Sequence, residues 1–180
     1  MRFCMVTTVY PPYHFCGDAV FVQALARALV ENGHHVEVVH CEDAYRLRGR
    51  EQPAVQVEQD GVVVHRLRSP FGMLSSLIIQ QTGKPGVKTI QLRAVLDRDF
   101  DVVNFHNISL IGGPCVLQMS RTPVTLYTLH EHWLVCPTHF FLIISWFVFG
   151  KIFKHKTLHP QSVWLYDRLF MSWIPRCERI

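Results

Sequence analysis

The sequence predicts an α/β fold in which helices cover a mostly parallel, doubly wound sheet. Two observations carry this prediction. Apolar runs typical of buried strands alternate along the chain with segments of helical periodicity. The first 40 residues also place a strand, a loop, a helix and a second strand in succession, the order of a right-handed βαβ crossover. We therefore expect five strands in the order 3-2-1-4-5.

The first βαβ unit contains the clearest local signals. Its first strand is expected at residues 3–6, and a helix is expected from Asp18, a favourable N-cap residue. Gly33 suits the left-handed position that closes a helix, and residues 35–40 predict the second strand. The apolar residues of the helix recur at i, i+3, i+4 and i+7, the spacing of a face packed on a sheet: Val22, Leu25, Ala26, Leu29.

The next segments alternate between loops, strands and helices. Residues 41–53 are polar and basic and predict an exposed loop. An Asp-Gly pair at residues 60–61 between two β-branched runs predicts a hairpin of residues 55–58 and 62–67. Helices are expected at residues 75–82 and 87–97, the second with these apolar positions: Ile90, Leu92, Val95, Leu96.

The last two predicted strands flank a short helix. Residues 101–105 and 123–129 have the composition of strands. Pro114 suits the first turn of a helix that runs to about residue 120. This alternation continues the α/β pattern as far as residue 129.

Composition limits the protein class. A hydrophobic content of 49% with 18% charged residues excludes a disordered chain. Six scattered cysteines make neither a disulfide framework nor a zinc framework, so reduced thiols in a cytoplasmic protein are expected. Residues 1–139 hold 12 Lys/Arg and 12 Asp/Glu, a balance that gives no reason to expect a nucleic-acid partner.

The composition changes after residue 139. Residues 140–180 hold six Lys/Arg, two Asp/Glu and ten of the 21 aromatic residues. We therefore expect one domain at residues 1–139 and an apolar, basic tail at residues 140–180. The ten apolar residues 140–149 are short for a membrane span. Residues 140–156 favour a segment that covers the sheet or contacts a membrane surface, and sequence after a frameshift is the alternative.

Polar residues follow three of the predicted strands. Because parallel strands share one carboxyl edge, we expect these residues to converge there and to bind a ligand. The predicted set comprises His14, Cys16, Gly17, Asp18, His106, Asn107, His130 and Glu131.

The histidines are the candidate catalytic residues. Imidazoles at two strand ends, His106 and His130, can exchange protons and hydrogen bonds with hydroxyl groups near neutral pH. Gly112 and Gly113 either offer backbone donors to a ligand or simply precede the helix at Pro114. The spacing of His and Cys residues after residue 129 matches no standard metal site, so no metal is expected.

Four stretches of residues 1–139 form a recognisable ordered set. They are the Pro-Pro loop before Gly17, the segment ALARALVENGHHVEVV, DVVNFHN at the fourth strand and TLYTLHEHW at the fifth. With this set, residues 1–139 resemble the N-terminal domain of family 4 glycosyltransferases of the GT-B fold. It implies a Rossmann-like half of a GT-B enzyme that retains anomeric configuration. The sugar would pass from a nucleotide-sugar donor, without a cofactor, to a glycan or lipid acceptor. It also implies that His106 and His130 face the transferred sugar.

The chain departs from this family in two ways. Cys16 occupies a position where the family usually has the first of two glycines, which would disturb a site that needs a positive φ there. The likeness also fades after residue 139, so we expect an incomplete enzyme that is inactive alone. Two alternatives remain, another Rossmann-type nucleotide-sugar enzyme such as an epimerase, and a non-catalytic module that binds a membrane or partner.

Overall fold

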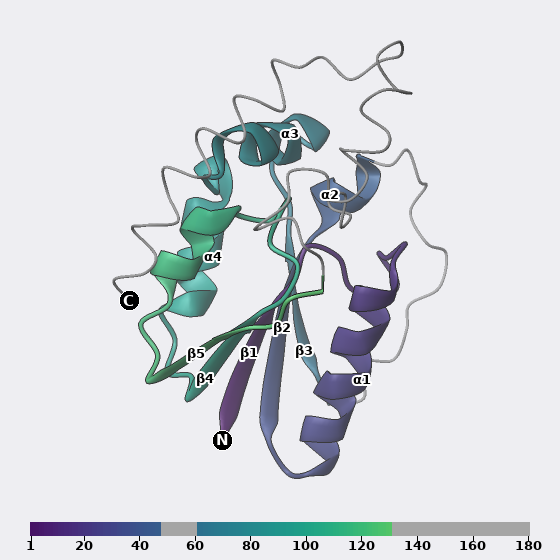
Figure 1. Ribbon diagram of the computed structural model, residues 1–180, viewed down its shortest axis with the longest axis vertical. Coiled ribbons are helices and arrows are strands. Elements are labelled where there is room, and N and C mark those ends of the chain that lie inside the picture. The colour runs from purple at the N-terminus through teal and green to yellow at the C-terminus, as the bar shows by residue number, and fades with distance from the viewer. Residues whose placement is uncertain (48–60, 131–180) are drawn as a thin grey trace, which may run out of the picture. The chain divides into compact units, whose positions relative to one another are not determined.

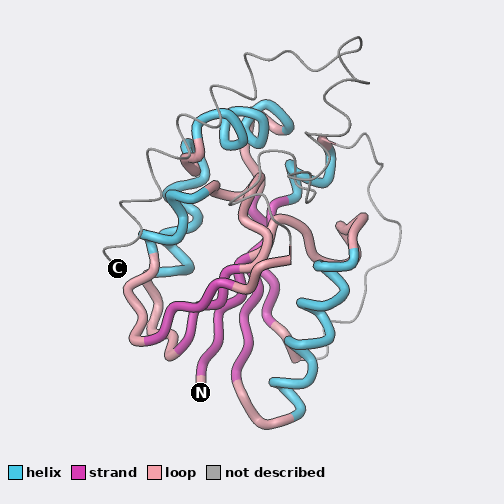
Figure 2. The backbone as a smooth tube through the Cα atoms, in the orientation of Figure 1, coloured by secondary structure: helices cyan, strands magenta, loops and turns pink. Residues whose placement is uncertain are grey.

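The computed structural model describes residues 1–47 and 61–130, which contain a five-stranded, entirely parallel sheet with flanking helices (Figures 1 and 2). The strand order β3-β2-β1-β4-β5 confirms the predicted order and the Rossmann-like α/β class. The chain divides into two compact units, Met1–Thr128 and Leu129–Ile180, and the sheet belongs to the first. The strands are β1 (Arg2–Val6), β2 (His35–Cys41), β3 (Val63–Leu67), β4 (Val102–Phe105) and β5 (Val124–Tyr127).

The helices follow the strands in the predicted alternation. In Figure 1, α1 and α4 lie on opposite sides of the sheet, as a doubly wound fold requires. The helices are α1 (Gly17–Glu31), α2 (Glu42–Arg46), α3 (Met73–Thr82) and α4 (Thr89–Leu96), with 3-10 turns η1 (Gly86–Lys88) and η2 (Pro114–Met119).

The core beneath α1 is built as the periodicity of this helix predicts. Val22 and Ala26 are fully buried and pack against Met5 of β1 and Val38 of β2. The helix ends where expected, since Gly33 has a φ of 78° and its N–H donates to the carbonyl of Val30. The apolar spacing of this segment was therefore sufficient to identify the buried face.

The start of α1 differs from the prediction. The helix begins at Gly17, with Cys16 as an extended N-cap residue that makes no side-chain cap hydrogen bond. Asp18 lies within the first turn, where its Oδ1 accepts from the N–H of Ala19 at 2.8 Å. A carboxylate there still interacts favourably with the positive end of the helix.

The segment after β2 was predicted wrongly. Residues 41–53 were expected to form an exposed loop, but α2 begins at Glu42, and Asp43 and Tyr45 are buried. Residues 48–53 and the first arm of the predicted hairpin, residues 55–58, lie outside the described residues. The second arm forms β3, which pairs with β2 in parallel.

Two smaller expectations need adjustment, and a third is not tested. Ile90 is 80% exposed although it was counted as an apolar position of α4, whereas Leu92, Val95 and Leu96 are buried as predicted. The helix that starts at Pro114 is a 3-10 turn. The predicted tail at residues 140–180, including the membrane segment 140–156, lies outside the described residues.

Candidate functional site

Asn107 connects the two loops that leave β1 and β4. Its Nδ2 donates to Asp18 Oδ2 at 3.0 Å, and its Oδ1 accepts from the hydroxyl of Thr8 at 3.2 Å. The backbone N–H of Thr8 also donates to the carbonyl of Asn107 at 2.6 Å. Residues separated by 89 and 99 positions are thus held together at the carboxyl edge of the sheet, the edge at which open α/β sheets bind ligands.

A second contact to the same side chain shapes the loop after β4. Both the hydroxyl and the N–H of Ser109 donate to Asn107 Oδ1, at 2.8 and 3.3 Å. The amide of Asn107 is therefore oriented by several partners at once, which fixes its position relative to the start of α1. We refer to Thr8, Asp18 and Asn107 as the Asn107 junction.

The first turn of α1 lies beside the Asn107 junction. Gly17 is exposed, and a Cβ added to it would meet no atom within 4 Å. Its N–H belongs to the positive end of a 15-residue helix, which favours an anionic or hydroxyl ligand. This part of the site therefore presents accessible backbone without any packing reason for a glycine.

Cys16 does not disturb this turn. Its φ of −142° is ordinary extended backbone, so the residue needs no positive φ here. Burial, followed by a hydrogen bond with Asp18, raises the pKa of the Cys16 thiol to about 12. The thiol is therefore neutral near pH 7 and is no nucleophile.

His14 and His106 occupy different environments. His14 is partly buried, and its Nδ1 has no hydrogen-bond partner among the described residues. His106 is fully buried, and its ring lies 6.2 Å from that of Phe21 on α1, which is 48% exposed. A sugar would reach the buried His106 only if neighbouring side chains moved, a restriction that the sequence did not reveal.

Gly112 and Gly113 are explained by packing. The N–H groups of both donate to the carbonyl of Ile108, so these donors are used within the chain's own turn. Gly113 has a φ of 60°, and a Cβ there would lie 2.7 Å from the backbone of Gly83. The structure thus favours the interpretation of these glycines as the start of a helix.

The remaining predicted site residues fall at the end of the described chain. His130 belongs to the second unit, whose position relative to the sheet is not determined. Glu131 lies outside the described residues. The roles of both residues stay predictions.

The other half of the carboxyl edge holds a buried ion pair that the sequence did not predict. Lys88 Nζ lies 3.2 Å from Asp43 Oδ2 and donates to the hydroxyls of Ser75 at 2.7 Å and Ser76 at 3.3 Å. Lys88 and Asp43 are both fully buried. Nothing in the sequence around Lys88 distinguishes it from the other polar residues of its helical segment.

His40 lies near this cluster at the end of β2. Its ring is 5.7 Å from that of Tyr13 and 6.2 Å from that of Tyr10, and neither ring nitrogen has a hydrogen-bond partner among the described residues. Burial, with a smaller contribution from the charge of Arg66, lowers the pKa of His40 to about 3. His40 is therefore a neutral residue of the core and is not suited to proton transfer near pH 7.

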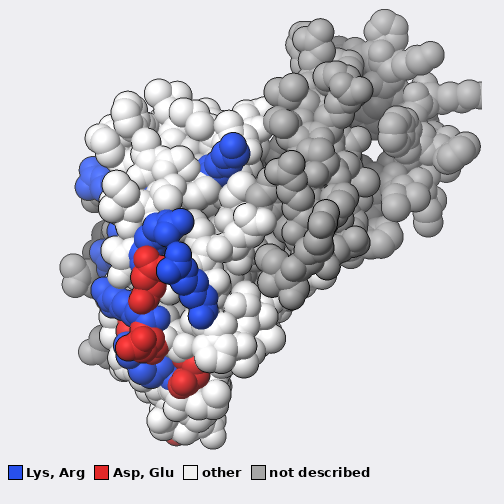
Figure 3. All heavy atoms as spheres, turned by 90° about the vertical axis from the view of Figure 1, so that its left-hand side faces the viewer, with Lys and Arg blue, Asp and Glu red and all other residues white. Residues whose placement is uncertain are grey.

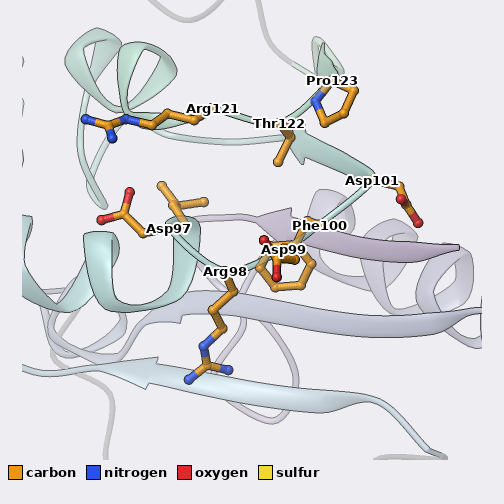
Figure 4. A pocket seen from close by; sticks show the side chains of 9 residues that line it. Asp97, Arg98, Asp99, Phe100, Asp101, Arg121, Thr122 and Pro123 are labelled. Carbon is orange, nitrogen blue, oxygen red and sulfur yellow. The ribbon is translucent and has the colours of Figure 1, made fainter.

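Charged side chains also gather at the opposite, amino edge of the sheet. Figure 3 shows mixed acidic and basic side chains in the lower part of the side that carries α4. An open hollow of about 530 Å³ lies at this edge, lined by residues 96–101 and 121–123 (Figure 4). Two of its charges are engaged, because Asp101 accepts from the N–H of Arg2 and Arg98 points away toward Glu37. We do not place the functional site in this hollow.

Glu37 on β2 organises that edge. Its side chain is 4% exposed and contacts Arg2, His35, His65 and Arg98 at 2.6–3.5 Å. Burial raises the pKa of Glu37, but hydrogen bonds from His65 and His35 and the charge of Arg98 outweigh it, so the pKa lies below its ordinary value. The cluster therefore anchors strands rather than supplying an acid or base.

Metal and membrane features were also sought in the described part of the chain. Residues 1–47 and 61–130 contain no group of three or more His, Cys, Asp or Glu side chains placed to hold a metal ion. Within the same ranges, no helix has the length and apolar character to cross a membrane.

Comparison with known families identifies one match. The model of a family described as "Glycosyl transferase 4-like domain" matches residues 17–174. The matched region begins at the first residue of α1 and continues past residue 139, where the composition changes. A search of curated proteins gives no match.

Proposed function

The chain belongs to the glycosyl transferase 4-like family, and from this premise we propose that it forms the acceptor-side half of a two-domain GT-B glycosyltransferase. Members of such a family act on a sugar donor and an acceptor. We further propose that the donor is a nucleotide sugar, that the acceptor is a glycan or lipid, and that transfer retains anomeric configuration without a cofactor. A second, donor-binding domain would complete the catalytic site.

The Asn107 junction is the observation that supports this proposal. It holds the positive end of α1 next to the loop after β4, with the exposed backbone of Gly17 beside a fixed amide. Backbone N–H groups at a helix start suit phosphate or hydroxyl oxygens. We infer that Gly17 and Asp18 contact the substrates and that the junction holds these two residues in position.

The histidines take different parts in this proposal. His106 is fully buried with its ring 6.2 Å from that of Phe21, so its proposed contact with the transferred sugar requires a local rearrangement. His14, with an unpaired Nδ1, is suited to a hydroxyl group of the acceptor. His130 and Glu131 are proposed to act from the segment that follows β5. The family match favours glycosyl transfer over epimerisation.

The sharpest test uses Gly17, because a side chain there meets nothing within the chain. We expect Gly17→Val to weaken binding about tenfold or more, about 1.4 kcal/mol. Its melting temperature should not fall, since valine tolerates a helix better than glycine does. Saturation-transfer NMR on the full chain would measure binding of UDP-glucose, GDP-mannose and short oligosaccharides.

The matched control is Ala24→Val, which adds a similar volume at an exposed position two turns further along α1. It should bind like the unmodified chain. Equal binding by Gly17→Val and Ala24→Val would contradict the proposed site, and an absence of binding to every probe would contradict the proposed substrates.

A further inference from the structure

Helix α3 exposes most of its apolar residues and buries two serines. Its buried residues are Ser75, Ser76 and Ile79. In contrast, Leu74 is 63% exposed and Ile78 is 54% exposed. A helix at the surface of a soluble domain normally shows the opposite arrangement.

The buried ion pair explains why this helix is inverted. Ser75 and Ser76 face inward because their hydroxyls accept from Lys88, and Ser75 also donates to Asp43. A buried charge needs such partners, since burying it without them costs more free energy than leaving aliphatic side chains exposed to water. Because the two serines must face Lys88, the apolar side of α3 faces outward.

The exposed apolar residues of α3 continue onto its neighbours. Phe71 precedes the helix and is 58% exposed, and Val87 of η1, which contacts α3, is 51% exposed. Contiguous apolar surfaces of this kind mark interaction sites. We name as the α3 apolar surface the residues Phe71, Met73, Leu74, Leu77, Ile78 and Val87.

The chain segment that carries the α3 apolar surface has charge of a single sign. Residues 61–96 contain no aspartate or glutamate. The same segment exposes four cations: Arg66, Arg68, Lys84, Arg93. In Figure 3, the upper part of the side that carries α4 shows neutral surface with scattered cations, while the acidic side chains lie lower.

We propose that the α3 apolar surface docks on an anionic lipid membrane. Large aliphatic and aromatic side chains would enter the boundary between headgroups and acyl chains, and the exposed cations of the same segment would contact anionic headgroups. A protein partner would fit the apolar groups, but the exclusion of every carboxylate over 36 residues is complementary to an anionic surface. This surface shares no residue with the Asn107 junction or with residues 140–156.

Vesicle sedimentation of the full chain tests the proposal. The probes are vesicles of phosphatidylcholine alone and vesicles in which about a third of the lipid is phosphatidylglycerol, whose anionic surface attracts basic segments. We expect binding to the anionic vesicles that weakens at least about tenfold when salt rises from about 0.1 to 1 M, because screening shortens the range of the attraction.

The decisive variant is Leu74→Gln with Ile78→Gln, which removes two exposed apolar groups and keeps good helix formers. We expect its vesicle affinity to fall at least about tenfold. The matched control is Val124→Thr with Leu126→Gln, on β5, where the exposed fractions are 42% and 48%. The control should bind vesicles like the unmodified chain.

Three outcomes would overturn the proposal. Unmodified chain that binds neither vesicle type would exclude a membrane surface as the occupant. Binding that is unchanged by the α3 double variant but lost on replacing Lys151, Lys154 and Lys156 by Gln would assign the contact to the tail. A dimer in light scattering that only the α3 double variant disrupts would assign the surface to a second copy of the chain.

Discussion

The carboxyl edge has one half at β1 and β4 and another at β2 and β3, and the two halves differ in how far their polar groups are buried. On the β1–β4 half, Asp18 and Asn107 stay partly exposed and are hydrogen-bonded to each other, although Thr8 and His106 beside them are buried. On the β2–β3 half, His40, Asp43 and Lys88 are fully buried. The first half can therefore face a ligand, whereas the second contributes to stability and depends on its charge state.

The largest expected effect is the loss of the buried ion pair. Lys88→Met leaves the Asp43 carboxylate buried without its cation, so the free energy of unfolding should fall by about 3–5 kcal/mol. Urea denaturation would measure this loss. Adding Asp43→Asn should recover part of it, because the uncompensated charge is then removed. A loss below about 1 kcal/mol would contradict the assignment of Lys88 to the buried pair.

Acid should weaken the same half through His40. The ordinary pKa of 6.5 applies to the unfolded chain, and the folded value is about 3. Between these values the unfolded chain binds a proton that the folded chain excludes, so stability falls as the pH decreases. The slope is about 1.4 kcal/mol per pH unit, or about 2 kcal/mol between pH 6.5 and 5.

The variant His40→Phe isolates this effect. It retains an aromatic ring beside Tyr10 and Tyr13 but cannot bind a proton. Denaturation at pH 6.5 and 5 should then give a flatter dependence than in the unmodified chain. Glu37 does not affect this comparison. Because the pKa of Glu37 is lowered, its contribution to the free energy of unfolding is lost only at more acidic pH. An unchanged slope would show that another group takes up the proton.

A smaller loss is expected at the Asn107 junction. Asn107→Ala removes the hydrogen bonds to Asp18 and Thr8, but water can replace some of them at a partly exposed position. The free energy of unfolding should fall by about 1 kcal/mol, measured from the urea midpoint. A loss as large as that of Lys88→Met would remove the distinction between the two halves.

The smallest effect is expected on the exposed side of α3. Leu74→Gln should change the free energy of unfolding by less than about 0.5 kcal/mol, because Leu74 is 63% exposed. Thermal and urea denaturation would both measure it. A larger loss would mean that Leu74 is covered in solution. The α3 apolar surface would then make a stable contact with the same surface of a second copy or with another part of the chain.

These halves also differ in how far the sequence predicted them. The strand order and the buried face of α1 followed from periodicity, because α1 packs directly on the sheet. The convergence of Asp18 and Asn107 followed from the parallel order of strands. The burial of Asp43 and the inversion of α3 did not, since they depend on a lysine that reaches both from η1. Pairwise contacts between distant segments leave no period in the sequence.

The Asn107 junction has a consequence for biosynthesis. The hydroxyl of Thr8 and the carboxylate of Asp18 gain their hydrogen bonds to Asn107 only when that residue, 99 and 89 positions later, leaves the ribosome. At about 5–20 residues per second, that delay is roughly 5–20 seconds. Throughout it, the loop between β1 and α1 lacks the hydrogen bonds of the Asn107 junction. A nascent chain stalled before β4 would therefore display this loop to chaperones and proteases.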